Sequence, residues 1–232
     1  MTFPFTSTTL VKDIVNKLPK ASDVFKKNRI DFCCGGNIPL SKAVSQNGLN
    51  MDNLLEELKI VFEKYEHVEK DVEVWTESDS NTIIDHIISN YHRTSKEELT
   101  MLSPYVTKVS RVHGDNHLEL LKVYELFYEL KKELIEHMEK EEAIVFPLIR
   151  KFTDGTIENK EEAINLVTEL EKEHDHAGEI LRQIRSVTSD FTLPLDACGT
   201  YRLVYARLEA LESLTFMHVH LENNILFPRY IA

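Results

Sequence analysis

Four long stretches with helical spacing of apolar residues constrain the fold more than any other feature of this sequence. They cover residues 82–111, 118–150, 160–189 and 198–228, with short polar or Gly- and Pro-containing breaks between them. Four amphipathic helices joined by short loops favour an up-down-up-down four-helix bundle. Only 7 Gly and 7 Pro residues are present, too few for a turn-rich sandwich or barrel. The sequence therefore predicts an all-α fold.

The first part of the chain is organised differently. Residues 1–66 contain several short helix-sized segments separated by Pro, Gly and Asn-Gly signals, which predict a small helical domain. Residues 67–80 are charged and weakly periodic, and are predicted to be a linker. Residues 81–232 are then predicted to form the bundle.

Charge and cysteine content exclude several classes of protein. The chain has 39 acidic and 27 basic residues and a formal net charge of -12, so we expect neither nucleic acid nor a membrane as a partner. No apolar run approaches the ~20 residues that cross a bilayer. Three cysteines, two of them adjacent, cannot build a disulfide framework, and the N-terminus does not resemble a signal peptide. The expected location is the cytoplasm.

An internal repeat links the second and fourth stretches. Residues 137–147 align with residues 218–228 in the pattern His-x3-Glu-x2-Ile-[Val/Leu]-Phe-Pro. Chance does not easily preserve the histidine, the carboxylate and the apolar positions at every spacing. The two segments are therefore predicted to do equivalent jobs.

Several polar side chains lie on the apolar stripes of the predicted helices. At about 100° per residue, His137 shares its stripe with Leu130 and Ile144. By the same geometry His176 and His220 point away from the stripes and are predicted to face solvent. The side chains predicted to point into the core are His92, His137, Glu141, His174, His218 and Glu222.

Four histidines and two carboxylates in one core indicate a metal site. Burying unpaired carboxylates costs on the order of several kcal/mol each, and no Lys or Arg lies centrally on these stripes. Two His-x3-Glu pairs suit two metal ions, with the glutamates able to bridge them. Imidazole and carboxylate ligands without thiolate favour iron or manganese over structural zinc. Ordinary buried His–Glu hydrogen-bonded pairs are the alternative.

Together with Asp31-Phe32-Cys33-Cys34-Gly35-Gly36, these motifs resemble the repair-of-iron-centres family, whose members are hemerythrin-like di-iron proteins with an N-terminal Cys-Cys-Gly-Gly domain. The resemblance spans nearly the whole chain. It implies two non-haem iron ions in a centre of the Fe–O–Fe type, held by the four histidines and bridged by the two glutamates. It also implies repair of iron–sulfur clusters damaged by oxidative or nitrosative stress, by supplying iron or removing nitric oxide.

The implied partners are damaged iron–sulfur proteins. Nitric oxide or dioxygen is the implied small ligand, and a homodimer is an assembly that the sequence leaves open. Oxygen-carrying hemerythrins have more histidines, so we do not expect reversible oxygen transport here. Two other functions stay open. One is a nitric-oxide or peroxide reductase to which the dithiol delivers electrons, and the other is an oxygen or nitric-oxide sensing module.

Cys33 and Cys34 precede two glycines, where the backbone can approach another group closely. A disulfide between neighbours would be strained, because their Cα atoms lie ~3.8 Å apart and disulfides prefer about 4.4–6.8 Å. The family resemblance implies a role in repair, as a redox or iron relay, and we expect a turn that exposes the thiolate and lowers its pKa. The alternative is two buried packing residues. Cys198, near the start of the fourth helix, is predicted to be structural.

Overall fold

The structure is a computed structural model that describes residues 2–66, 75–156 and 160–231. All the regular elements in these ranges are helices, which confirms the predicted all-α class. The chain divides into two compact units, one made of residues 1–83 with 219–230 and the other essentially of residues 84–218. Residues 67–74 of the predicted linker lie outside the described part of the chain.

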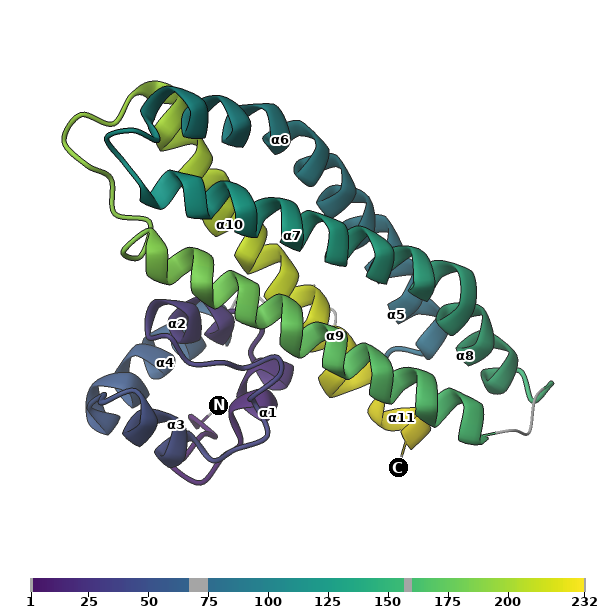
Figure 1. Ribbon diagram of the computed structural model, residues 1–232. Coiled ribbons are helices and arrows are strands. Elements are labelled where there is room, and N and C mark those ends of the chain that lie inside the picture. Colours follow the sequence, from purple (N-terminus) through teal and green to yellow (C-terminus); the bar gives the residue numbers. More distant parts are fainter. Residues whose placement is uncertain (1, 67–74, 157–159, 232) are drawn as a thin grey trace. The chain divides into compact units, whose positions relative to one another are not determined.

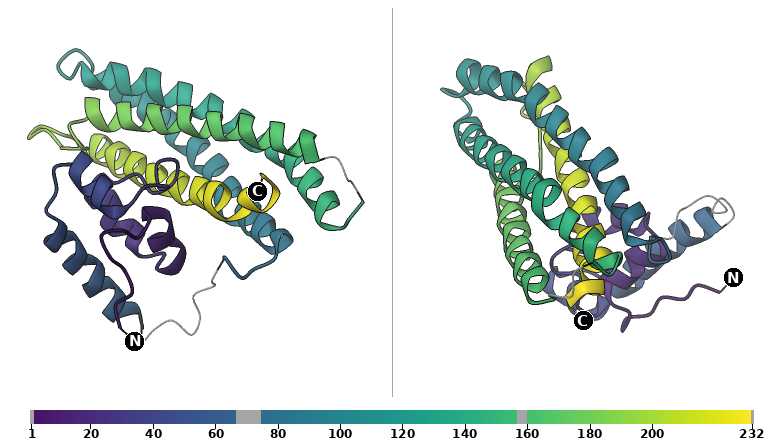
Figure 2. Two further views of the ribbon diagram at one scale, coloured as in Figure 1. Left: turned by 90° about the horizontal axis from the view of Figure 1, so that it is seen from below. Right: turned by 90° about the vertical axis from the view of Figure 1, so that its right-hand side faces the viewer.

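Four long helical rods make the bundle and run side by side in Figures 1 and 2. Each begins and ends within a few residues of a predicted stretch, because the apolar periodicity and the polar breaks set its limits. The four rods are α5 (Ser80–His86), η1 (Ile87–His92) and α6 (Arg93–His113), then α7 (Glu119–Lys140), η2 (Glu141–Val145) and α8 (Phe146–Thr153), then α9 (Lys160–Val187), then α10 (Gly199–Leu221), η3 (Glu222–Leu226) and α11 (Pro228–Ile231).

The bundle core consists of the apolar stripes of these helices. Phe127 and Leu130 on α7 are fully buried, and so is Val204 on α10. Each such side chain contributes about 1.5–3 kcal/mol of transfer free energy when it leaves water. Packing of the stripes therefore fixes which residues of each helix face inward.

Three of the rods contain a π-helical turn, labelled η. In η2 the Phe146 N–H donates to the Glu141 carbonyl, and in η3 the Phe227 N–H donates to the Glu222 carbonyl at 2.8 Å. Proline follows each phenylalanine, and it has no N–H to donate to the carbonyl four residues earlier. The wider turn accommodates this missing donor in both repeated segments. An extra residue per turn also rotates everything that follows.

The other unit contains four shorter helices, α1 (Val11–Lys17), α2 (Ala21–Lys27), α3 (Leu40–Gln46) and α4 (Met51–Glu66). Ile14, Phe25, Leu40 and Leu58 are fully buried in it. It also includes residues 219–230, so the last turns of the fourth rod belong to this unit. Among the described helices, none has the length and apolar character needed to cross a bilayer.

Candidate metal centre

The six side chains predicted to point inward are all buried, with exposed fractions between 0% and 5%. His92 ends η1, His137 lies on α7 and His174 lies on α9. Glu141 and Glu222 begin the two repeated π turns, each four residues after a histidine. Two groups of four residues bring one ligand atom each to within 4.8 Å of one another, and the groups are His92, Glu141, His218 and Glu222, and His137, Glu141, His174 and Glu222. Both carboxylates belong to both groups.

The imidazoles present their Nε2 atoms to the centre. The Nε2 atoms of His92 and His218 lie 3.0 Å apart, and those of His174 and His137 lie 2.9 Å apart. The Nδ1 atoms of His92 and His137 contact carboxylate oxygens, which only accept hydrogen bonds, so Nδ1 carries the proton in each ring. Their Nε2 atoms are then the lone-pair donors that a metal ion requires.

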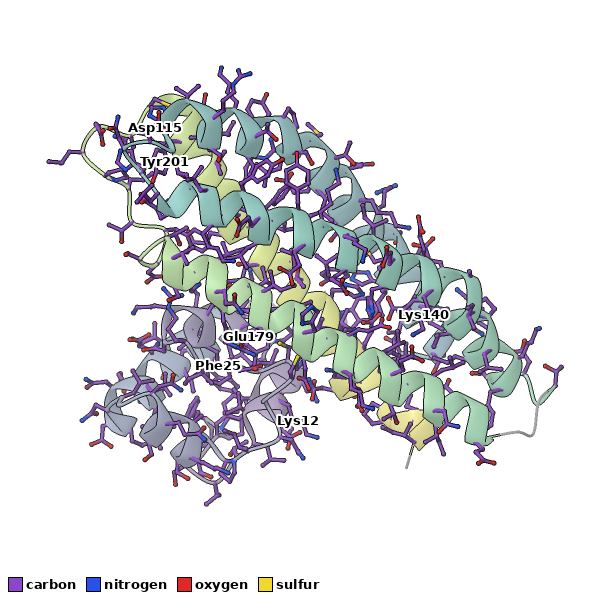
Figure 3. All side chains as sticks on the ribbon, viewed as in Figure 1. Lys12, Phe25, Asp115, Lys140, Glu179 and Tyr201 are labelled. Carbon is purple, nitrogen blue, oxygen red and sulfur yellow. The ribbon has the colours of Figure 1, made fainter. Side chains whose placement is uncertain are left out.

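The carboxylates on these Nδ1 atoms belong to Glu142 and Glu173, which the sequence interpretation missed. Glu142 Oε1 lies 2.8 Å from His92 Nδ1, and Glu173 Oε2 lies 2.7 Å from His137 Nδ1. The hydrogen bond from His137 and another from Lys140 lower the pKa of Glu173 to about 2, although burial opposes the shift. Lys140, labelled in Figure 3, lies 2.8 Å from Glu173 Oε1. The only sequence signal for Glu142 and Glu173 is that each is adjacent to a predicted ligand. Glu142 follows Glu141, and Glu173 precedes His174.

Glu141 has the chemistry of a cation ligand. Its side chain is fully buried, and neither oxygen has an aligned hydrogen bond to any described residue. His92 Nε2 and His137 Nε2 lie 3.3 Å from its two oxygens. Burial alone would raise the pKa of Glu141, but the neighbouring imidazoles, His137 above all, outweigh burial and hold the pKa well below its usual range. A buried, ionised carboxylate facing imidazole nitrogens fits a divalent metal.

Two other histidines test the helical wheel. The His176 side chain is 51% exposed, as predicted. His220 is 1% exposed, so the prediction that it faces solvent is wrong. Its Nδ1 donates to the Phe32 carbonyl at 3.2 Å. Ile144 is 51% exposed, so it does not share the buried stripe of His137, whereas Ile225 at the same position of the other copy of the repeat is buried.

Asp31 organises the loop of Cys33 and Cys34. Its Oδ1 accepts the backbone N–H groups of Cys33 at 3.0 Å and Cys34 at 3.1 Å. A Cβ on Gly36 would lie 2.4 Å from the Phe32 carbonyl oxygen, so this close approach requires glycine, as the sequence predicted.

The two thiols are not equivalent. Cys33 is 4% exposed, whereas Cys34 is half-buried. The hydrogen bond to Cys34, burial and the charge of Asp31 all raise the pKa of Cys33 well above its usual range. The expectation of an exposed thiolate with a lowered pKa is therefore wrong for Cys33. The third cysteine, Cys198, has its Sγ 3.2 Å from His113 Nε2, and its structural role stays a prediction.

Comparison with known proteins agrees with this arrangement. Residues 83–230 match the family model of the hemerythrin HHE cation binding domain, and residues 8–62 match a domain of unknown function, DUF542, named ScdA_N. The iron–sulfur cluster repair protein ScdA of Staphylococcus haemolyticus is 38% identical over 225 residues, 97% of this chain and 99% of the relative. The chain belongs to the repair-of-iron-centres family.

Two further relatives also align along nearly the whole chain. The iron–sulfur cluster repair protein YtfE of an Enterobacter species is 36% identical over 220 residues, 95% of each chain. The ScdA protein of Staphylococcus epidermidis is 34% identical over 234 residues. The similarity covers both the DUF542 segment with Cys33 and Cys34 and the hemerythrin segment with the buried histidines. As a member of the repair-of-iron-centres family, the chain has a hemerythrin-like bundle whose buried His and Glu side chains could hold metal.

Proposed function

We propose that this protein is a di-iron protein that repairs iron–sulfur clusters damaged by oxidative or nitrosative stress. One observation carries most of the argument: two buried groups of His and Glu ligand atoms share the same two carboxylates. Relatives that align along nearly the whole chain are named iron–sulfur cluster repair proteins. The substrates would be damaged iron–sulfur proteins, and the chain would act in the cytoplasm.

In this proposal each iron has two histidines of its own and both glutamates in common. One ion would be held by His92 and His218, the other by His137 and His174, with Glu141 and Glu222 as bridges. Four protein donors per ion would be fewer than the six that iron often takes, so a loaded centre would have room to bind a small ligand such as dioxygen or nitric oxide. Glu142 and Glu173 would orient His92 and His137 and strengthen their nitrogens as donors.

Two routes to repair are compatible with such a centre. The ions could leave and refill a damaged cluster, or they could bind and remove nitric oxide. Cys33 and Cys34 would then relay iron or reducing equivalents. A nitric-oxide or peroxide reductase is the alternative function, since open iron positions and a dithiol are what such an enzyme needs. Continuous turnover of nitric oxide with a reductant would favour that alternative.

The first experiment measures iron per chain and the Mössbauer spectrum of protein purified without oxygen. We expect two irons, and a loss of both in the double variant His137→Ala plus His218→Ala. His176→Ala is the matched control, because this exposed histidine lies outside both ligand groups. One iron per chain in fully loaded protein, or an unchanged content in the double variant, would refute the two-iron assignment. The second experiment measures reactivation of a nitric-oxide-treated iron–sulfur enzyme by the loaded protein.

A further inference from the structure

In the loop that contains Cys33 and Cys34, called the dithiol loop, hydrogen bonds engage both backbone N–H groups and backbone carbonyl groups. Asp31 accepts the N–H groups of Cys33 and Cys34, as described above. On the other side, the Asn224 side chain donates to the Cys33 carbonyl at 2.9 Å, and His220 donates to the Phe32 carbonyl. These residues all belong to the unit formed by residues 1–83 and 219–230. These hydrogen bonds fix the backbone of the loop, whereas its two sulfur atoms have different surroundings.

The internal repeat shows which residues of the last rod are specialised for this contact. The two copies share the histidine, the glutamate, the isoleucine and the Phe-Pro pair. They differ at the polar positions that hold the loop, because His220, Asn223 and Asn224 replace Glu139, Glu142 and Ala143. We call His220, Asn223 and Asn224 the loop cradle. The second rod has the same helical turn without these side chains, so a π turn does not by itself require them.

The environments of the two sulfur atoms are unequal. The Cys33 thiol is buried, and its Sγ lies 3.3 Å from Asp31 Oδ1 and 3.8 Å from the Cys34 Sγ. The Cys34 thiol is half-buried, and the Asn223 amide nitrogen lies 3.9 Å from its sulfur. A small reactant reaches Cys34 first. The Asp31 carboxylate is placed to take the proton of Cys33 in a later step.

We propose that Cys34 is the attacking thiol of the pair, that Cys33 is the resolving thiol, and that the loop cradle consists of positioning residues that enforce this order. The substrate class is a disulfide. This inference rests on the proposed redox relay by the dithiol, and it specifies which sulfur does what.

The reaction balances as a thiol–disulfide exchange in two steps. The Cys34 thiolate attacks one sulfur of the disulfide, the S–S bond of the disulfide breaks, and the other half leaves as a thiolate that takes a proton from solvent. Cys33 then gives its proton to Asp31 and attacks the Cys34 sulfur, the mixed S–S bond breaks, and the second half leaves as a thiolate that takes the proton from Asp31. One disulfide is reduced to two thiols, and the cysteine pair is oxidised to a strained vicinal disulfide.

The test uses the chromogenic disulfide dithiobis(nitrobenzoate) and the full-length chain with Cys198→Ala, so that the pair supplies the reactive thiols. The parent should release two thionitrobenzoate ions per chain and retain no adduct. Cys33→Ser should release one ion at the parental initial rate and keep an adduct on Cys34, measured by mass spectrometry. Cys34→Ser should react at about one tenth of the parental initial rate or below, because its remaining thiol, that of Cys33, is buried. A slow Cys33→Ser variant, or a Cys34→Ser variant as fast as the parent, would overturn the order.

Asn224→Ala tests the cradle, because Ala143 occupies the same position in the other copy of the repeat. We expect the ratio of Cys34 to Cys33 labelling by iodoacetamide to fall severalfold, and Asn224→Asp to behave alike because it keeps the volume but loses the donor. Asn90→Ala is the control, since the Asn90 amide bonds within its own helix, to the His86 carbonyl at 3.2 Å. An unchanged ratio in a folded Asn224 variant would refute the role of the cradle. These readouts need no iron and no damaged cluster, so they separate this inference from the proposed function.

Discussion

At the scale of single residues, Glu141 and Glu212 are both buried acids with opposite surroundings. Glu212 is 3% exposed and accepts hydrogen bonds from the Arg185 guanidinium, at 2.8 Å for one of them. Glu141 faces imidazole nitrogens and has no Lys or Arg ion pair within the described chain. A buried carboxylate that is paired with a cationic side chain stabilises the fold. A buried carboxylate that faces neutral imidazole nitrogens is suited to bind a metal ion together with them.

Replacement by leucine separates these two roles. Glu141→Leu and Glu222→Leu should lose metal while keeping the helical signal, because leucine suits an apolar stripe and removes the desolvation cost of a buried carboxylate. Glu212→Leu should keep its metal and lose on the order of 2 kcal/mol of unfolding free energy, because Arg185 loses a buried partner. Circular dichroism, denaturant titration and metal analysis measure both effects. A Glu141→Leu protein that unfolds while retaining full metal would contradict this assignment.

His117 gives a pH-dependent prediction away from the candidate centre. Its Nε2 lies 3.1 Å from Asp196 Oδ2 and its Nδ1 lies 3.2 Å from Glu119 Oε1. The hydrogen bond to Asp196 raises the pKa of His117 above its usual value, although desolvation opposes this shift.

A raised pKa in the folded state stabilises the protein below the unfolded value of ~6.5 and ceases to do so as the pH rises through the folded value. The stability lost in His117→Gln should therefore be larger near pH 6 than near pH 9, as measured by urea unfolding at both values. Asp196→Asn should reduce the same pH-dependent difference, because Glu119 remains as a partner of the ring. A loss in His117→Gln that is equal at both pH values would show that the ring contributes by packing alone.

At the scale of the secondary-structure element, the π turns set the direction of the residues that follow the repeated glutamates. Deleting Ala143 should convert η2 into a regular α-turn, because one residue fewer restores the α-helical register. Everything after Glu141 would rotate by about 100°. We expect the variant to stay helical, to melt at a lower temperature and to lose metal. Ala143→Ser keeps the residue count at an exposed position and should change none of these readouts. Full metal content in the deletion variant would rule out this role of the turn.

The helices and the inward-pointing set could be predicted because burial imposes a period of 3.6 on the sequence. His92, His137, Glu141, His174, His218 and Glu222 were all found this way, and all are buried. The wheel failed for Ile144, whose side chain is exposed although its counterpart in the repeat, Ile225, is buried. It also failed for His220, whose burial depends on a contact with the Phe32 carbonyl far away in the sequence. Glu142 and Glu173 were missed for a similar reason, since each acts on a histidine of another helix.

At the scale of the whole molecule, the last rod contributes to both compact units. A chain that begins at Ser78 keeps all six proposed ligands but removes most of the unit to which residues 219–230 belong. We expect it to be helical and to bind two irons. It should melt at a lower temperature than the full chain, because His220 loses the Phe32 carbonyl and Asn224 loses the Cys33 carbonyl.

The truncated protein should also repair a nitric-oxide-treated iron–sulfur enzyme poorly, since the dithiol is absent. The full-length Cys33→Ser plus Cys34→Ser variant is the matched comparison, because it lacks the thiols and keeps the rest of the unit. Equal melting temperatures for the truncated and full chains would mean that residues 1–77 do not stabilise the last turns of the rod. Full repair activity in the double serine variant would confine the chemistry to the bundle.

The division of the last rod between the two units has a consequence for synthesis on the ribosome. The N-terminal helices emerge first, but the residues that bond to the Phe32 and Cys33 carbonyls come near the end of the chain. At ~5–20 residues per second, the intervening segment takes on the order of ten seconds to translate. During that time the cysteine loop has Asp31 but not His220 or Asn224. A nascent chain thus exposes its dithiol before it can protect it, and thiol-reactive stress would damage newly made copies more readily than mature ones.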